Sequence, residues 1–285
     1  MIRPADVVID FLEAEQTRGV THVFLDEGAR DGLRDLFRRS HAGTAARGAP
    51  SPESVAESPP QPAKPAAVPT KVTAEGESKA ERLASLRQQA ASWQPARALG
   101  TLREAMVFAT GNPDSRIMLV GEAPGYEEEK KAEPFVGPAG QKLDDILKAM
   151  GLTREEVYIS NIVKFRPATA RQTTNNRKPS PQEMAACLPF IRAEIDIIRP
   201  ACIIALGGTA AEGLLGLTGT VGAMRGSWHE FDGIPVRVTY HPSYLLQSGA
   251  NLTVKRQVWE DMLMVMEQLI MPISAKQRGF FLPKT

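Results

Sequence analysis

Three short segments hold residues whose types and spacing could bind a planar ligand. Gly121-Glu122-Ala123-Pro124-Gly125 is a glycine-rich turn, whose backbone amides can approach a ligand closely. Asn161 offers an amide edge that both donates and accepts hydrogen bonds, and His241 begins a loop of small and apolar residues. Taken alone, each has an ordinary interpretation: a connecting turn, a capping asparagine and a structural histidine. The chemistry therefore depends on the fold bringing the three segments together.

Two further features near these segments are compatible with DNA. The loop 164–178 contains five basic residues and no acidic one, in a chain whose formal net charge is only +1. Such a loop is either solvated charge or a set of phosphate contacts. After His241, the residues Tyr244, Leu245 and Leu246 either pack beneath a helix or form a wedge that enters a base stack. The basic residues of the loop are Lys164, Arg166, Arg171, Arg177 and Lys178.

The elements around these segments predict an α/β fold. Short apolar runs at 117–120, 157–159, 202–206 and 236–240 read as strands, and helical patterns at 140–150, 181–198 and 209–215 separate them. Continuous apolar strands that alternate with helices are typical of a parallel sheet covered on both faces. Because ligands bind at the carboxyl ends of such strands, the turn, the asparagine and the histidine are expected at one edge of the sheet.

Three regions are expected along the chain. Residues 1–40 are a small helical segment, residues 41–78 form a flexible linker with seven prolines between 50 and 69, and residues 79–285 form the α/β domain. The absence of a long apolar run or an apolar leader predicts a cytoplasmic protein. The two cysteines exclude a disulfide framework and a four-cysteine cluster, and the near-zero net charge argues against a protein that coats nucleic acid.

The motifs, in their order, resemble those of the uracil-DNA glycosylase superfamily, specifically family 4. The resemblance rests on Gly121–Gly125, Pro134–Gly140, Asn161–Lys164 and His241–Leu246, and extends over about residues 102–270. It implies a four-stranded parallel sheet flanked by helices. It also implies hydrolysis of the N-glycosidic bond of a uracil flipped out of DNA, as a monomer that acts in base-excision repair.

The resemblance assigns roles to individual residues. Phe135 matches the aromatic that stacks on uracil, and Asn161 matches the side chain that reads its Watson–Crick edge. His241 matches the donor to uracil O2, where negative charge develops on the departing base. Gly121, Glu122, Ala123 and Pro124 are expected to line the pocket, with Ser243, Tyr244 and Leu245 against DNA. Glu128 matches a position that crowds a thymine methyl group, although an acidic triplet is also typical of a helix start.

Two departures from the family bear on catalysis and on the cofactor. The third place of the first motif is Ala123, which cannot act as a base, so Glu122 becomes the candidate for orienting water or stabilising the sugar cation. Family 4 carries a [4Fe–4S] cluster on four cysteines, but only Cys187 matches one of these positions and Phe165 occupies another. One thiolate cannot hold a cluster, so we expect a protein without this cofactor and without any other metal.

Two other functions remain open at this level. The first is a glycosylase-fold module that binds uracil-containing or single-stranded DNA without fast chemistry. The second is a nucleotide-binding α/β protein that uses the turn 121–125 for phosphate, although no phosphate-loop lysine follows it. Residues 1–40 are expected to be a docking element that recruits a repair partner or contacts DNA, although the 13 basic and 13 acidic side chains of residues 1–100 do not favour DNA.

Overall fold

The computed structural model describes residues 71–247 and 251–282, which belong to the compact unit Lys64–Thr285. The expected helical segment 1–40 and the linker up to residue 70 lie outside the described residues. The last part of the expected linker, 71–78, is described, and there Val72 is buried in the hydrophobic core. This end of the linker is therefore part of the α/β domain, because Val72 has apolar neighbours that its local sequence does not reveal.

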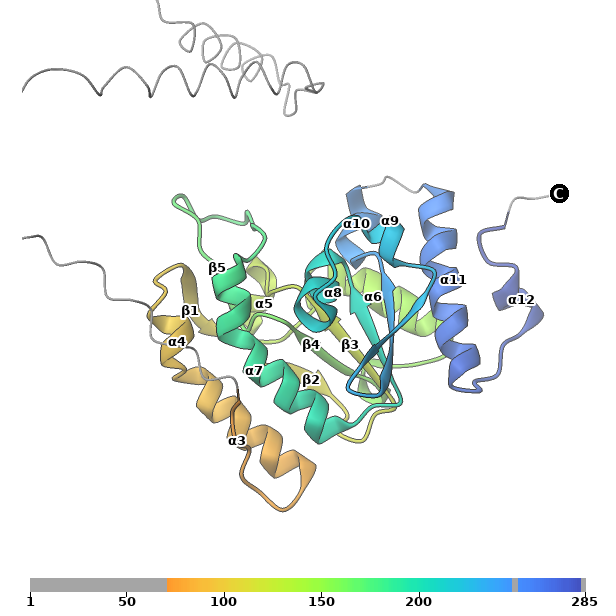
Figure 1. The fold of residues 1–285 in the computed structure, drawn as a ribbon. Helices are drawn as coiled ribbons and strands as arrows, with labels where there is room; N and C mark the ends of the chain where they lie inside the picture. Colours follow the sequence, from red (N-terminus) through yellow and green to blue (C-terminus); the bar gives the residue numbers. More distant parts are fainter. Residues whose placement is uncertain (1–70, 248–250, 283–285) are drawn as a thin grey trace, which may run out of the picture. The chain divides into compact units, whose positions relative to one another are not determined.

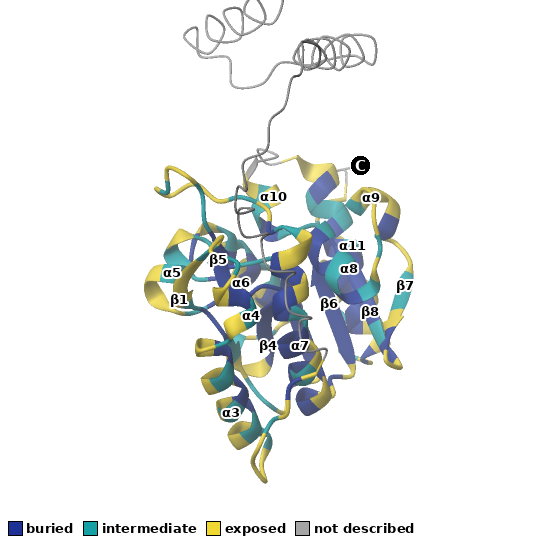
Figure 2. Ribbon diagram, turned by 60° about the vertical axis from the view of Figure 1, so that its left-hand side comes forward, coloured by how far each residue is buried: buried dark blue, intermediate teal, exposed yellow. Residues whose placement is uncertain are grey.

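Four parallel strands form the centre of the domain, as the apolar runs predicted. They are β3 (Ile117–Gly121), β4 (Tyr158–Asn161), β6 (Cys202–Leu206) and β8 (Ile234–Thr239), in the order β4-β3-β6-β8. The register pairs Gly121 with Asn161, so the turn and the asparagine leave neighbouring strands at the same level. Nearly every residue of these strands is buried (Figure 2), and β3 and β6 are accordingly apolar throughout. The polar exceptions have buried partners, as Arg237 of β8 has in Asp261.

Two antiparallel edge strands extend this sheet to six strands, which the sequence analysis did not predict. β2 (Ala109–Gly111) pairs with β4 and β7 (Trp228–Phe231) pairs with β8. A separate two-stranded sheet joins β1 (Leu102–Met106) to β5 (Phe165–Pro167). β1, β2 and β7 are short and partly exposed, and β5 has only three residues, so their sequences lack the apolar signal of the central strands.

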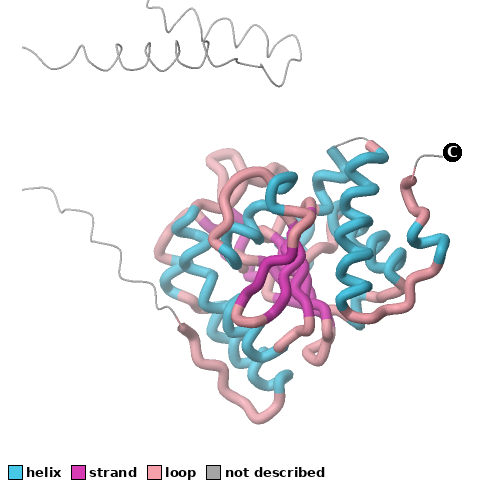
Figure 3. The backbone as a smooth tube through the Cα atoms, turned by 45° about the vertical axis from the view of Figure 1, so that its right-hand side comes forward, coloured by secondary structure: helices cyan, strands magenta, loops and turns pink. Residues whose placement is uncertain are grey.

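Helices cover both faces of the sheet (Figures 1 and 3). One face packs against α3 (Lys79–Ala91), α7 (Pro181–Ile198) and α8 (Gly208–Leu215), and alternate strand residues such as Met118 and Val120 point to it. The other face packs against α6 (Pro138–Met150) and α11 (Leu252–Gln268) and receives the intervening strand residues. The remaining elements are short: α4 (Gln94–Arg97), α5 (Tyr126–Lys131), η2 (Arg154–Glu156), α9 (Val221–Met224), α10 (Pro242–Gln247) and α12 (Ala275–Arg278).

Local sequence explains where the larger helices begin and end. Helix α7 starts with Ser180 as its cap, Pro181 in the first turn and Glu183 completing a capping box. Helix α6 starts at Pro138 and ends at Gly151, whose φ of 81° suits the left-handed conformation of a helix end. None of the helices in the described ranges combines the length and the apolar character needed to cross a bilayer.

Candidate functional site

A cavity of about 240 Å³ lies at the carboxyl ends of β3, β4 and β8. Residues from all three predicted segments line it, although they are up to 120 positions apart in the sequence. The fold therefore brings the turn, the asparagine and the histidine together, as a parallel sheet requires. Its lining residues are Glu122, Ala123, Pro124, Gly125, Glu128, Phe135, Ala139, Asn161, Asn176, Arg177, His241 and Ser243.

Asn161 is the most informative residue of the cavity. Its side chain is only 2% exposed, and its Oδ1 has no hydrogen-bond partner within the described part of the chain. Leaving a buried acceptor unpaired costs about 1–3 kcal/mol, so a ligand that donates to this oxygen gains by entering. Gly121 leaves room for the amide, since a Cβ on this residue would lie 2.4 Å from Asn161 Oδ1.

Phe135 forms a rigid wall beside Asn161. Its ring is buried, and its backbone has a φ of 55°, which is unusual for a residue with a side chain. The Phe135 carbonyl accepts a hydrogen bond from Arg154 Nη1 at 3.0 Å. A Cβ on Gly140 would lie 1.8 Å from the same carbonyl oxygen, so only glycine fits there. The loop 134–140 thus holds the ring in place from behind.

His241 is a neutral donor. Its Nδ1 accepts the backbone N–H of Ser243 at 3.2 Å and lies 2.8 Å from Ser243 Oγ. Because Nδ1 is the acceptor, the proton of the neutral ring resides on Nε2. Burial lowers the pKa of His241 to about 4, which keeps the ring neutral at physiological pH. The ring centroid lies 5.6 Å from that of Phe135, on the same cavity.

Glu122 supplies an acidic group to the cavity. Its Oε2 accepts a short hydrogen bond from the hydroxyl of Thr209, a buried residue in the first turn of α8. Burial raises the pKa of Glu122, although the Thr209 hydrogen bond opposes this effect. Ala123 lines the cavity without a polar atom on its side chain. Glu122 is therefore the acidic residue that the first motif presents.

Glu128 uses its carboxylate to join two loops. Its Oε2 accepts the N–H of Gly125 at 3.1 Å, and its Oε1 accepts the N–H groups of Val136 at 3.1 Å and Gly137 at 2.8 Å. The residue stands in the first turn of α5, where the interpretation of the acidic triplet as a helix start is confirmed. Glu128 thus holds the turn 121–125 against the loop that carries Phe135.

Two of the five basic residues assigned to phosphate contacts are buried, and that assignment is wrong for them. Lys164 is 0% exposed and forms an ion pair with Glu194 of α7 at 2.5 Å. It also donates to Ser160 Oγ at 2.6 Å and to the Asn161 carbonyl at 3.0 Å. Arg166 is 1% exposed and pairs with Glu129 of α5 at 2.8 Å. Both acidic partners lie far along the chain, so the loop appeared unpaired in the sequence.

The rest of the basic loop is closer to the surface. Arg171 and Lys178 are exposed, and Lys178 forms an ion pair with Glu212 at 2.9 Å. Arg177 lines the cavity and pairs with Glu183 at 2.6 Å. Asn176 also lines the cavity, and the sequence analysis missed it. Its position within the basic loop was the only signal, and asparagine is common in loops for other reasons.

Helix α10 follows His241 and presents apolar side chains. Tyr244 is 42% exposed and stacks on Tyr240, with ring centroids 5.0 Å apart. Leu246 is exposed as well, whereas Leu245 is half-buried and lines a separate apolar cavity beside Trp259. The two interpretations of this segment each describe part of it: Leu245 packs, and Tyr244 and Leu246 protrude.

The residues at the expected cluster positions do not fit an iron–sulfur cluster. Phe165 and Cys187 are both buried in the same apolar core, and burial raises the pKa of the Cys187 thiol to about 11. The second cysteine, Cys202, is buried within β6 on the opposite face of the sheet. Over residues 71–247 and 251–282, no three cysteine, histidine or acidic side chains gather as metal ligands would.

Comparison with known proteins agrees with this fold and site. Residues 108–263 match the family described as the Uracil DNA glycosylase superfamily. This match includes all four central strands and the residues from Phe135 to His241 that line the cavity. The chain belongs to the uracil-DNA glycosylase superfamily.

Relatives place the chain near the type-4 branch, as the motifs predicted. It is 45% identical over 161 residues to the Type-4 uracil-DNA glycosylase of Thermotoga maritima, covering 56% of this chain and 80% of the relative. It is 38% identical over 156 residues to the Type-4 uracil-DNA glycosylase of Pyrobaculum aerophilum, covering 52% and 76%. A Type-5 uracil-DNA glycosylase of the same organism is 29% identical over 162 residues.

Proposed function

We propose that this protein is a uracil-DNA glycosylase that hydrolyses the bond between uracil and deoxyribose in DNA. The observation that carries the proposal is the buried Oδ1 of Asn161, which has no partner within residues 71–247 and 251–282, in one cavity with the neutral imidazole of His241 and the ring of Phe135. These three groups are a hydrogen-bonding edge, a donor and a stacking surface. Together they match a planar base with both polar edges and π-faces.

Asn161 would select uracil over cytosine. Uracil presents N3–H as a donor and O4 as an acceptor, so it pairs with the Oδ1 and Nδ2 of one amide. Cytosine presents its N3 as an acceptor and its 4-amino group as a donor. Its N3 lone pair would then face the buried Oδ1 of Asn161, which would stay unpaired. A site with a buried polar group discriminates strongly in this way, because the wrong partner leaves that group unpaired.

His241 would stabilise the leaving base. In the reaction, the oxygen of water bonds to C1′ of the sugar while the C1′–N1 bond breaks and its electron pair passes to the uracil ring. The water loses one proton to solvent, and the uracil anion takes one up as it leaves. Negative charge then develops on O2, and the Nε2–H of a neutral His241 can donate to it. Donors placed in advance at such a charge contribute about 10²–10³-fold to a rate.

Glu122 would act on the sugar and the water. Its carboxylate lies in the cavity with the hydroxyl of Thr209 as a fixed partner, which suits either an attacking water or the positive charge that develops on deoxyribose. Asn176 adds a second polar group to the same cavity. Since Ala123 offers no base, electrostatic stabilisation carries more of the catalysis in this proposal.

DNA would reach the cavity over the exposed residues around it. Arg171, Arg177 and Lys178 remain candidates for phosphate contacts, and Ser243, Tyr244 and Leu245 for contacts with the flanking bases. A substrate of uracil-containing DNA is consistent with a cytoplasmic protein. The monomeric state and a repair partner at residues 1–40 stay predictions.

We also propose that the enzyme works without an iron–sulfur cluster. The apolar burial of Phe165 and Cys187 supports this, because one thiol with a raised pKa is a poor ligand set. Absorption near 400 nm in protein purified without oxygen, with about four irons per chain, would overturn this part.

The proposal is tested by release of free uracil from a single-stranded oligonucleotide, with iron measured on the same sample. We expect release by the wild-type protein and a loss of about 10²-fold or more in Asn161→Ala, with DNA binding retained. Tight binding of uracil-DNA by the wild-type protein with no base released over hours would instead support a binding module.

A further inference from the structure

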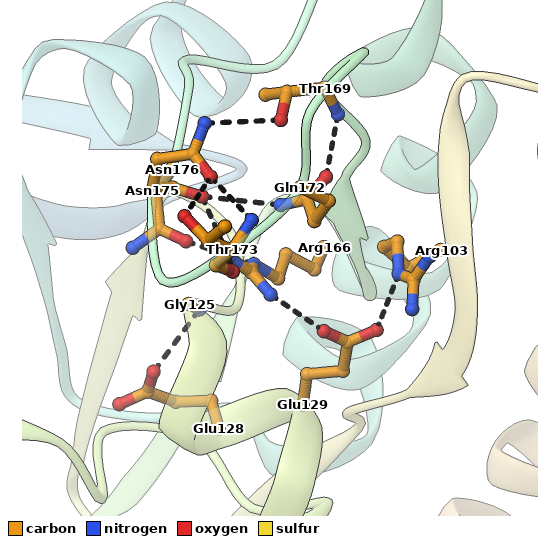
Figure 4. A network of polar contacts seen from close by, with 10 residues as sticks. All are labelled: Arg103, Gly125, Glu128, Glu129, Arg166, Thr169, Gln172, Thr173, Asn175 and Asn176. Carbon is orange, nitrogen blue, oxygen red and sulfur yellow. Dashed lines mark hydrogen bonds and ion pairs between the residues drawn. The ribbon is translucent and has the colours of Figure 1, made fainter.

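One buried guanidinium ties the middle of the loop 168–178 to the domain (Figure 4), while Ala168, Arg177 and Lys178 hold its two ends. Arg166 Nε donates to Asn176 Oδ1 at 2.9 Å, and its Nη2 donates to the carbonyls of Thr173 at 2.8 Å and Asn175 at 2.7 Å. Its Nη1 donates to Glu129 Oε2 at 2.8 Å. Three of these four hydrogen bonds hold the loop, and the fourth fixes the guanidinium to α5.

We propose that Arg166 is a positioning residue, which holds Asn176 and the loop 168–178 as a wall of the uracil cavity. This inference rests on the proposed function and deepens it. Arg166 itself does not line the cavity, whereas Asn176 does. Its effect on the reaction therefore passes through Asn176.

The hydrogen bond to Arg166 determines which way the Asn176 amide faces. Its Oδ1 is engaged by Arg166 Nε, so its Nδ2 is the end that remains for the cavity. A Cβ on Gly125 would lie 3.1 Å from this Nδ2, which places the amide beside the turn 121–125. Arg166 thus presents a hydrogen-bond donor next to the turn that lines the cavity.

The anchor of Arg166 is itself held in place. Glu129 also accepts from Arg103 Nε of β1 at 2.9 Å. Burial would raise the pKa of Glu129, but the hydrogen bonds from Arg166 and Arg103 outweigh it and hold that pKa below its usual value. The carboxylate is therefore ionised, as a charge-assisted anchor must be.

Only arginine fits this position. A guanidinium has donors in a rigid fork, which reach a side-chain oxygen, two carbonyls and a carboxylate at once. A lysine ammonium could keep the ion pair with Glu129 but has a single nitrogen for all partners. The middle of the loop also bonds within itself, as in the Thr169 N–H to Gln172 Oε1 contact at 2.6 Å, so we expect the loss of Arg166 to displace residues 169–176 together.

The experiment compares Arg166→Lys with Arg103→Lys as its matched control. Both residues are arginines that pair with Glu129, but Arg103 is half-exposed and does not contact Asn176. We expect kcat for uracil release to fall about 10–100-fold in Arg166→Lys, since small displacements of positioned groups have effects of this size. Arg103→Lys is expected to stay within about twofold of the wild-type rate. The KM, the DNA affinity and its salt dependence should be unchanged in both.

A double variant identifies the route of the effect. If Arg166 acts through Asn176, then Arg166→Lys combined with Asn176→Ala releases uracil about as fast as Asn176→Ala alone. If the double variant is instead slowed by the product of the two single effects on the rate of uracil release, the proposal is overturned. A lower DNA affinity with a salt slope reduced by about one in Arg166→Lys, which marks a phosphate contact, would also overturn it.

Failure of the inference can be told apart from failure of the proposed function. If the wild-type protein releases no uracil, the proposed function is wrong, and amide hydrogen exchange still tests the positioning role. Faster exchange over 168–178 in Arg166→Lys than in Arg103→Lys is then expected. Equal exchange in the two variants would overturn the role of Arg166.

Discussion

The cavity and the Phe165–Cys187 region differ in how their polar groups are satisfied. We define the second region by Trp93, Phe165, Cys187 and Phe190. In the cavity, a buried oxygen of Asn161 has no partner among the described residues. In the Phe165–Cys187 region, Trp93 packs edge-on against Phe190 with centroids 5.0 Å apart, and its Nε1 donates to the Ala186 carbonyl at 2.7 Å.

This difference indicates which of the two regions meets a ligand. An unpaired buried acceptor destabilises the protein unless a ligand pairs with it, whereas a packed apolar region needs no partner. The cavity therefore retains the features of a binding site. The Phe165–Cys187 region retains the features of a core, although the family resemblance places a cofactor there.

The largest expected effect on uracil release comes from removing the His241 side chain from the cavity. His241→Ala should lower kcat for uracil release about 10²–10³-fold, because the donor to the leaving base is lost. His229→Ala is the control, since His229 is also half-buried but lies on the edge strand β7, where its Nε2 is hydrogen-bonded to the Met224 carbonyl, and is not among the residues that line the cavity. Rates within twofold of wild type in both variants would refute the assignment of His241.

A methyl group added at Gly121, behind the lining residues Asn161 and Phe135, should have the next largest effect. In Gly121→Ala, the new Cβ would meet Asn161 Oδ1 at 2.4 Å and Phe135 Cζ at 2.5 Å, so both groups must move. We expect kcat/KM to fall about 10²-fold. In the control Gly208→Ala, the new Cβ has no neighbour closer than 3.8 Å. Steady-state kinetics on both variants measure this, and equal kcat/KM values would contradict a rigid cavity.

Lowering the pH should reduce the rate of uracil release only near pH 4, where His241 becomes protonated. The pKa of His241 is lowered to about 4 by burial, so the rate should show no histidine titration near 6.5 and should be about halved at pH 4. A pH–rate profile of Glu122→Gln, which lacks the second titrating group, isolates this step. A limb near pH 6.5 in that variant would show that His241 is not the buried neutral donor.

The same group makes stability depend on pH. The unfolded chain binds the histidine proton near pH 6.5 and the folded chain only near pH 4. The unfolded state is therefore favoured progressively as pH falls from 6.5 to 4. We therefore expect the free energy of unfolding to fall less between pH 6.5 and pH 4 in His241→Ala than in the wild-type protein. Urea denaturation of both proteins measures this.

The smallest effect is expected in the Phe165–Cys187 region. Cys187→Ala should leave the rate of uracil release within about twofold of wild type, because the thiol is part of the core. It should lower the free energy of unfolding by about 1 kcal/mol, the value of a buried group the size of a methylene. Denaturant titration and the uracil-release assay measure both. Complete loss of activity with loss of bound iron would show that Cys187 is a cofactor ligand.

Much of the sheet could be predicted because its signals are local. The central strands β3 and β6 are continuous apolar runs and β4 and β8 contain shorter ones, and the helices begin and end at recognisable residues such as Ser180 and Gly151. The edge strands β2 and β7 carry no such signal, because one side of each faces solvent. The order and spacing of the motifs, with the rule that ligands bind at the carboxyl ends of parallel strands, placed Asn161 and His241 in one site.

The tertiary structure alone decided the roles of the charged and polar residues near the cavity. Lys164 and Arg166 looked like free cations because their partners, Glu194 and Glu129, stand on helices about 30 to 40 positions away. Asn176 lines the cavity and accepts a hydrogen bond from Arg166, and neither contact is visible in the sequence. Apolar burial is written in the chain as a repeating pattern, but an ion pair between distant residues depends on how the elements pack. The sequence by itself thus determined the four central strands and the turn, asparagine and histidine of the site, and the packing determined which charges remain available to a ligand.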